Sequence, residues 1–155
     1  MSQTERRSSV IAVFRRTARQ MVAELIDRLA AVGFHGVTPA IHAVFENIDR
    51  GGTRVTDLAA RADMTRQSMS ELVAALERRG WVRRHVDPTD RRAQIVRLTP
   101  EGRRLVIAAL SAMTEIENEW QARWRRAGSR ANLRTVIETA LAGTTQGRSK
   151  TVASA

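Results

Sequence analysis

The sequence predicts a mainly helical protein with one small β-hairpin, and three observations support this fold class. Long stretches place apolar residues every three or four positions, which is the spacing of an amphipathic helix. Threonines, some of them followed by proline, precede several of these stretches in the way that helix N-caps do. Two short segments, 81–86 and 93–98, alternate apolar and polar residues, as half-buried strands do. The predicted order is four helices, two strands and two further helices.

The first two helices are predicted from apolar periodicity and from the residues that interrupt it. Residues 10–32 carry their apolar side chains on one helical face, and Gly33 and Gly36 end this helix. Thr38-Pro39 then begins a second helix with an apolar stripe that reaches Ile48, and Gly51-Gly52 stops it. Residues 1–9 are polar, and we expect them to be disordered.

Two shorter helices follow, joined by a tight turn. Thr56 is the expected cap of the third helix, and Thr65 caps the fourth, which Gly80 ends. Asp63 lies at the turn position, where a positive φ is required and where Asp is tolerated better than most residues. The predicted inward-facing residues are Leu58, Ala59 and Ala62 in the third helix and Met69, Leu72, Val73 and Leu76 in the fourth. This pattern is typical of a helix-turn-helix.

The hairpin and the last two helices complete the chain. A charged, turn-rich segment at 87–92 separates the two predicted strands. Thr99-Pro100 begins a long helix that Gly128-Ser129 breaks, and the last helix is expected to end near residue 142. Residues 143–155 are rich in Gly, Ser and Thr, so we expect a disordered tail.

The charge favours an anionic partner. The chain has 26 basic and 16 acidic residues, a net charge of +10. All the basic residues except Lys150 are arginine, so compositional bias is an alternative cause. The position of the charge separates the two explanations, because residues 50–104 contain 13 arginines and 7 acids. The charge is concentrated in the helix-turn-helix and the hairpin, which favours nucleic acid as the partner.

The composition also excludes several functions. The absence of cysteine rules out disulfides, thiolate metal sites and a cysteine nucleophile. The three histidines are scattered, so no metal site is expected. No catalytic Ser/His/Asp spacing and no Gly-rich phosphate loop occurs, so neither an enzyme nor a cofactor is predicted. No signal peptide or membrane-spanning run occurs, so we expect a cytoplasmic protein without a membrane partner.

The fourth helix is the element expected to contact DNA. Its polar face can present hydrogen-bond donors and acceptors to base edges in a major groove. A solvated helix face is the alternative, and a carboxylate at Glu71 would also suit a protein partner, although Glu can accept a hydrogen bond from cytosine. The candidate DNA-binding residues of this helix are Thr65, Arg66, Gln67, Ser68, Ser70, Glu71 and Arg78.

The hairpin tip supplies a second candidate contact. Arg91 and Arg92 extend from the turn, and arginine is attracted by the negative potential of a narrow minor groove. Asp90 is expected to pair with Arg92 and stiffen the tip, although which arginine enters the groove stays open. A charged solubilising turn is the alternative. The candidate phosphate contacts are Arg54, Arg83 and Arg84, with Arg97 beside them.

Three runs in order carry a family resemblance: Leu76-Glu77-Arg78-Arg79-Gly80-Trp81-Val82, Asp87-Pro88-Thr89-Asp90-Arg91-Arg92 and Val96-Arg97-Leu98-Thr99-Pro100-Glu101-Gly102. They resemble the MarR family of winged-helix transcription regulators over residues 10–142. The resemblance implies a winged helix-turn-helix at 38–99, flanked by one dimerisation helix at 10–37 and two more at 100–142. It further implies a homodimer on pseudo-palindromic double-stranded DNA, with 65–79 in the major groove and 87–93 as the wing.

The resemblance also implies a ligand. Many members repress nearby genes and release DNA when a small aromatic or anionic effector binds. Phe45 and Met113 can equally be core residues and His42 a structural histidine, and the operator, the regulated genes and the choice between repression and activation stay open. The positions matching the family's ligand pocket are Arg15, Arg19, His42, Phe45 and Met113.

Overall fold

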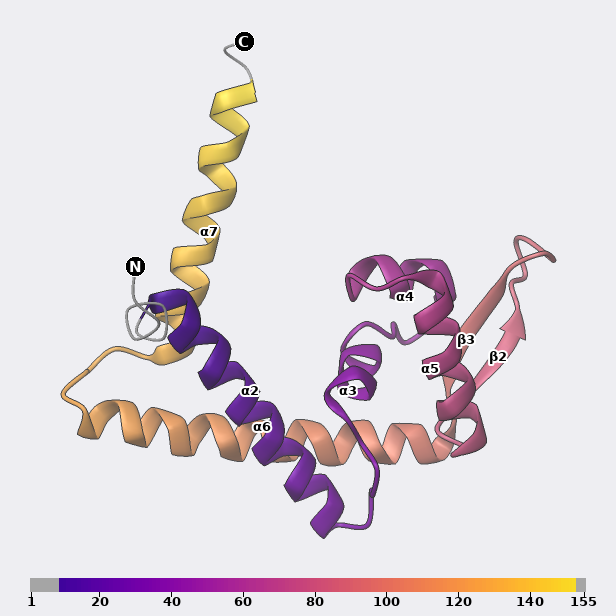
Figure 1. The fold of residues 1–155 in the computed structure, drawn as a ribbon, viewed down its shortest axis with the longest axis horizontal. Helices are drawn as coiled ribbons and strands as arrows, with labels where there is room; N and C mark the ends of the chain where they lie inside the picture. The colour runs from indigo at the N-terminus through magenta and orange to yellow at the C-terminus, as the bar shows by residue number, and fades with distance from the viewer. Residues whose placement is uncertain (1–8, 153–155) are drawn as a thin grey trace. The chain divides into compact units, whose positions relative to one another are not determined.

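The fold is taken from a computed structural model that describes residues 9–152, and the side chains of residues 9–142. Figure 1 shows its elements, which divide between two compact units, one up to Met113 and one from Thr114. The order is α2 (Val10–Ala31), α3 (Pro39–Glu46), β1 (Thr53–Arg54), α4 (Val55–Arg61), α5 (Arg66–Arg78), β2 (Val82–Val86), β3 (Gln94–Leu98), α6 (Pro100–Arg126) and α7 (Leu133–Val152).

Three helices begin with the caps that the sequence predicts. Thr38, Thr65 and Thr99 each accept a hydrogen bond on Oγ1 from the amide three residues on, at 3.2, 3.1 and 3.0 Å. Ser9 caps α2 in the same way at 3.2 Å. Each of these bonds satisfies an amide that has no partner within its own helix.

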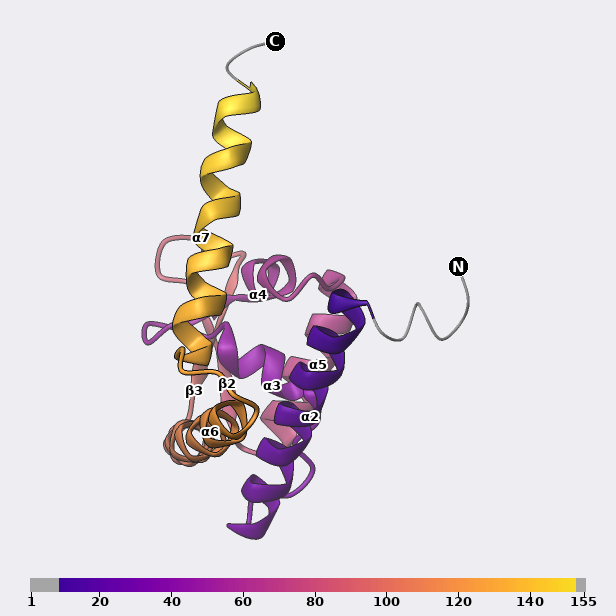
Figure 2. The same cartoon turned by 90° about the vertical axis from the view of Figure 1, so that its left-hand side faces the viewer.

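The helix-turn-helix forms the centre of the first unit. Asp63 joins α4 to α5 with a φ of 52°, as predicted for the turn position. Leu72 and Ala62, both predicted to face inward, are half-buried. The views in Figures 1 and 2 show α3 beside α2 and α5, and α3 packs against both. The buried apolar residues of this unit are Leu25, Leu29, Val37, Ile41, Val44, Leu58, Ala59, Met69, Val73, Leu76, Trp81, Val82, Val96, Leu105 and Ala112.

The sheet has one strand more than the sequence predicts. Its three antiparallel strands lie in the order β1-β3-β2, with Val82 opposite Leu98 and Thr53 opposite Val96. β1 was missed because it has only two residues, too few for an alternating pattern. Gly52 precedes it with a φ of 92°, and a Cβ there would overlap the side chain of Ile95. Beyond β1 the sheet is a two-stranded hairpin that projects from the helices (Figure 1).

β1 also explains two errors in the predicted helix boundaries. α3 ends at Glu46, where the Asn47 side chain donates to the carbonyl of Ala43 at 2.7 Å, and so stops before Gly51. α4 begins at Val55 directly after the strand, with Arg54 at its N-cap position and no side-chain cap. Thr56 therefore lies inside α4, and its predicted capping role is wrong.

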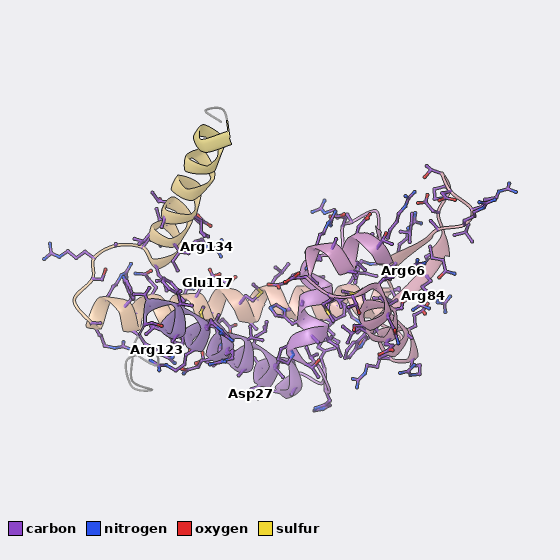
Figure 3. The ribbon with its side chains drawn as sticks, turned by 45° about the horizontal axis from the view of Figure 1, so that its top comes forward. Asp27, Arg66, Arg84, Glu117, Arg123 and Arg134 are labelled. Atoms are coloured by element: carbon purple, nitrogen blue, oxygen red, sulfur yellow. The ribbon has the colours of Figure 1, made fainter. Side chains whose placement is uncertain are left out.

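The second unit contains the end of α6 and the described part of α7. The Gln121 side chain fastens the corner between them, because it accepts from the amide of Leu133 at 2.8 Å and donates to the carbonyl of Ala131 at 3.1 Å. Arg134 pairs with Glu117 at 2.6 Å, and Figure 3 shows the two side chains side by side.

The ends of the chain differ in part from the prediction. α7 continues to Val152, ten residues beyond the expected end at 142, so the predicted tail is wrong as far as Val152. The segment from Gly143 contains no proline, and glycine lowers helix stability by only about 1 kcal/mol. Residues 1–8 and 153–155, predicted to be disordered, lie outside the described residues.

Among the residues that the structure describes, no helix has the length and hydropathy needed to cross a bilayer.

Candidate nucleic-acid interface

α5 presents a polar face opposite its buried stripe. Met69, Val73 and Leu76 are fully buried, which turns the other side of the helix outward. Of the seven predicted contact residues, Ser68 and Ser70 are half-buried. The exposed ones are Thr65, Arg66, Gln67, Glu71 and Arg78.

Hydrogen bonds distinguish the residues of this face. Thr65 donates through its hydroxyl to the Ser68 hydroxyl at 2.9 Å, so both side chains take part in the helix cap. Gln67 donates to the Glu71 carboxylate at 3.3 Å, one helical turn away. Within the described part of the chain, Arg66 and Arg78 make neither a hydrogen bond nor an ion pair through their side chains. These two cations are therefore available to a ligand, and Figure 3 labels Arg66 on the helix.

The tip of the hairpin is an ordered turn that leaves its arginines exposed. The amides of Asp87 and Ala93 donate to the carbonyls of Ala93 and Asp90 at 3.0 and 2.9 Å. The expected pairing of Asp90 with the Arg92 side chain is wrong, because the Asp90 carboxylate accepts instead from the Arg92 backbone amide at 3.0 Å. Among the residues described, neither the Arg91 nor the Arg92 guanidinium contacts a protein group by hydrogen bond or ion pair.

The base of the hairpin is held by a buried carboxylate. Asp87 is 4% exposed and accepts from the Thr89 amide at 2.8 Å, the Thr89 hydroxyl at 2.7 Å and the Arg54 Nε at 2.6 Å. The Arg54 Nη2 also lies 2.6 Å from Asp87 Oδ2. The two hydrogen bonds from Thr89, and after them Arg54, lower the pKa of Asp87 to about 2. The same contact raises the pKa of Arg54.

A second contact joins the hairpin to α5. Arg84 Nη2 donates to the carbonyl of Ser70 at 2.9 Å, and the Arg84 amide donates to the Glu77 carboxylate at 2.8 Å. Arg84 Nε lies 3.5 Å from the other Glu77 oxygen, close enough for an ion pair. Figure 3 labels Arg84 on the hairpin beside α5. Like Arg54, Arg84 is thus already engaged by protein groups.

The outer face of the hairpin carries two opposed arginines. Arg83 and Arg97 are directly opposite each other across β2 and β3, and both are exposed. Arg97 Nε donates to the carbonyl of Gly51 at 3.0 Å. Like charges directly opposite on a sheet destabilise it, and an anion between them would relieve the repulsion. Of the three candidate phosphate contacts, Arg83 is the one that the described residues leave without a side-chain partner.

The five candidate ligand residues are not joined into one site by direct interactions. Arg15 and Arg19 are exposed on α2, and His42 lies 3.2 Å from Glu46 on its own helix. Phe45 packs against Trp81 with ring centroids 6.2 Å apart, and Met113 is half-buried. Their proposed shared role in ligand binding stays a prediction.

Sequence reasoning missed the partners of the engaged arginines. Asp87, Thr89 and Glu77 had no assigned partner, although all three lie inside the runs that carry the family resemblance. It also missed two contacts of Arg79. The Arg79 guanidinium stacks on the ring of Trp81, 5.3 Å from the ring centroid, and donates a hydrogen bond to the carbonyl of Gly36 at 3.1 Å. The sequence shows that arginines are concentrated in residues 50–104, but it does not show which acid each arginine contacts.

Together, the α4–α5 pair and the three-stranded sheet define a winged helix-turn-helix, in which α5 occupies the place of the recognition helix and residues 87–93 form the wing. The sequence profile of the MarR family matches residues 35–93, which include α4, α5, β2 and the wing. This match confirms the resemblance that the runs 76–82, at the end of α5, and 87–92, in the wing, carry.

Two groups of known proteins are similar to the chain. The transcriptional regulator HosA of Escherichia coli O111:H- is 34% identical over 88 residues, which are 56% of this chain and 65% of HosA. Among solved structures, the transcriptional repressor CouR bound to a 23-mer DNA duplex has a TM-score of 0.69 at 24% identity, over 94% of this chain and 98% of that one. CouR from Rhodococcus jostii RHA1 bound to p-coumaroyl-CoA has a TM-score of 0.68 at 23% identity, over 90% of each chain. At these identities the solved structures establish the fold.

Proposed function

We propose that this protein is a dimeric, sequence-specific regulator of transcription that binds double-stranded DNA and acts as a ligand-responsive repressor in the cytoplasm. The observation that carries the proposal is the pairing of two exposed cationic elements, the α5 face and the wing tip. Arg66 and Arg78 supply the first, and Arg91 and Arg92 the second. α5 would enter the major groove and the wing arginines the adjacent minor groove.

The relatives support the same function. HosA is named a transcriptional regulator, and CouR is a repressor solved on a DNA duplex. Because the chain spans 65% of the length of HosA, the regulatory activity belongs to the proposal and not to the match itself. Arg83 is the phosphate contact that we favour, because Arg54 and Arg84 already bind protein groups.

Exposed apolar residues support a homodimer. Ile11 and Phe14 on α2 are 74% and 54% exposed, and Ile107 on α6 is 67% exposed. In the second unit Val136 on α7 is 45% exposed. Helices that expose large apolar side chains gain stability when a partner surface covers them. A second copy of the chain would place two wings on one duplex, which predicts a pseudo-palindromic site.

An effector ligand is the least constrained part of the proposal. CouR binds p-coumaroyl-CoA, an aromatic acyl group on an anionic carrier. Arg15 and Arg19 could attract an anion and Phe45 an aromatic ring. Addition of p-coumaroyl-CoA to the DNA complex, with release measured by fluorescence anisotropy, tests this ligand class.

The proposal is tested by selecting duplexes from a random pool with the full chain. It predicts enrichment of one pseudo-palindromic sequence with half-sites about 10 base pairs apart. Enrichment of no sequence, with weak and uniform binding that salt abolishes, would contradict specific recognition. No binding even at low salt would favour a protein partner for the α5 face, the alternative that exposed Glu71 suggests.

A further inference from the structure

Two of the arginines that the sequence marks as phosphate contacts are turned toward the protein. Arg54, at the start of α4, contacts Asp87 and Thr89 at the end of β2. Arg84, in the middle of β2, contacts Ser70 and Glu77 on α5. The N-cap of α4 is therefore tied by side chains to the turn that follows β2, and α5 is tied to β2 itself.

We propose that these contacts are two braces that set the angle between the wing and the recognition helix, and that Arg54, Asp87, Arg84 and Glu77 are positioning residues for DNA binding. The inference rests on the proposed function, because it concerns how the same interface is arranged. It assigns the four residues to orientation and leaves contact with DNA to α5, Arg83 and the wing tip.

The core orients the base of the hairpin, where Val82 and Val96 are buried, whereas Val86 and Gln94 at its outer end are exposed. β1 pairs with β3 over two residues only, so most of the wing is a two-stranded ribbon, and ribbons of this kind twist more than wide sheets. If the wing tip were free to change its orientation relative to α5, only some of its conformations would bring Arg91 and Arg92 to the minor groove. Holding the tip in one orientation before binding lowers the conformational entropy lost on binding.

The burial of the braces fits an internal role. The Asp87 side chain is 5% exposed, and Arg84 and Glu77 are 27% and 29% exposed. Arg84 Nε is buried without a hydrogen bond and has only the Glu77 carboxylate nearby to offset its desolvation. Removing Glu77 would leave the partly buried Arg84 guanidinium without its carboxylate, and removing Asp87 would leave Arg54, which is 41% exposed, with its weaker contact to Thr89.

Substitutions of Asp87 and Glu77 test the proposal, because long-range electrostatics and loss of a brace predict opposite changes in DNA affinity. Asp87→Asn and Glu77→Gln each remove a negative charge from a DNA-binding surface, so long-range electrostatics alone would tighten binding to every duplex. Loss of a brace would instead weaken binding to the selected duplex by about tenfold. Asp63→Asn is the matched control, because Asp63 is exposed in the turn between α4 and α5, its side chain contacts neither brace, and asparagine tolerates its positive φ.

The experiment measures the affinity of the full chain for the selected duplex and for a scrambled duplex of the same length. We expect Asp87→Asn and Glu77→Gln to weaken binding to the selected duplex and to keep or strengthen binding to the scrambled one. The Asp63→Asn variant should bind both duplexes at least as tightly as the unmodified protein. The double variant Arg54→Gln/Asp87→Asn, which keeps the net charge, should lose specific affinity as Asp87→Asn does.

Two results would overturn the proposal. Equal or tighter binding of both acid variants to the selected duplex would show that the braces do not matter. A parallel loss on both duplexes would assign the residues to stability alone. Thr89→Val, which removes only a hydroxyl from the first brace, guards against misfolding and should show a smaller loss of the same kind. If the unmodified protein selects no duplex at all, the proposed function fails and not the braces.

Discussion

At the scale of single residues, the best-defined electrostatic site is Asp87. Its pKa lies at about 2, below the ordinary 3.8, because the folded state surrounds the carboxylate with hydrogen-bond donors from Thr89 and with Arg54. A folded-state pKa below the unfolded one means that Asp87 stabilises the fold above about pH 4 and that this contribution is lost as the pH falls toward about 2.

The Asp87→Asn variant is therefore expected to have a lower free energy of unfolding than the unmodified protein at pH 7. This difference in unfolding free energy should shrink as the pH falls from about 4 to about 2. Urea unfolding at a series of pH values measures this difference. A difference that does not change with pH would mean that the carboxylate charge is not what stabilises the wing base.

Gly102 is a second residue with a sharp expectation. A Cβ at this position would overlap the carbonyl oxygen of Trp81, which is backbone and cannot rotate away. Gly102→Ala should therefore destabilise the fold by about 1–3 kcal/mol, measured by chemical unfolding. Gly51→Ala is the control, since a Cβ at Gly51 would meet nothing within 4 Å, and it should change stability by less than about 1 kcal/mol. Equal effects of the two substitutions would refute the steric explanation.

At the scale of elements, the threonine caps of α3, α5 and α6 are features that local sequence determines. Thr38 Oγ1 caps α3 away from the proposed DNA contacts. Thr38→Ala should cost about 1 kcal/mol in unfolding free energy, whereas Thr38→Ser should keep most of the stability because the hydroxyl remains. If serine destabilises the fold as much as alanine, the threonine acts through its methyl group and not as a cap.

The same scale shows where sequence reasoning succeeds and where it stops. Asp63 and the caps at Thr38, Thr65 and Thr99 were predicted correctly because the residues that decide them lie within one helical turn. The end of α3 and the start of α4 depend instead on β1, which exists only because β3, about forty residues later, pairs with it. The role of Arg54 depends on Asp87, 33 residues away, so a single sequence could mark its charge but not its partner.

At the scale of the whole molecule, the central question is assembly on DNA. If Ile11 and Phe14 pack against a second copy, Phe14→Asp should convert the protein to a monomer in light scattering and weaken binding to the selected duplex. Val32→Asp is the control, because Val32 is 65% exposed but lies at the C-cap of α2. A Phe14→Asp variant that remains dimeric would place the dimer interface elsewhere.

The most direct test of the account is the salt dependence of binding to the selected duplex with the wing arginines removed. Arg91→Ala and Arg92→Ala should each weaken binding by about tenfold or more and reduce the slope of log affinity against log salt by about 1. Arg130→Ala, which removes an equally exposed arginine from the second unit, should leave the slope unchanged. Unchanged affinity and slope in both wing variants would contradict the claim that this winged helix holds DNA through its wing.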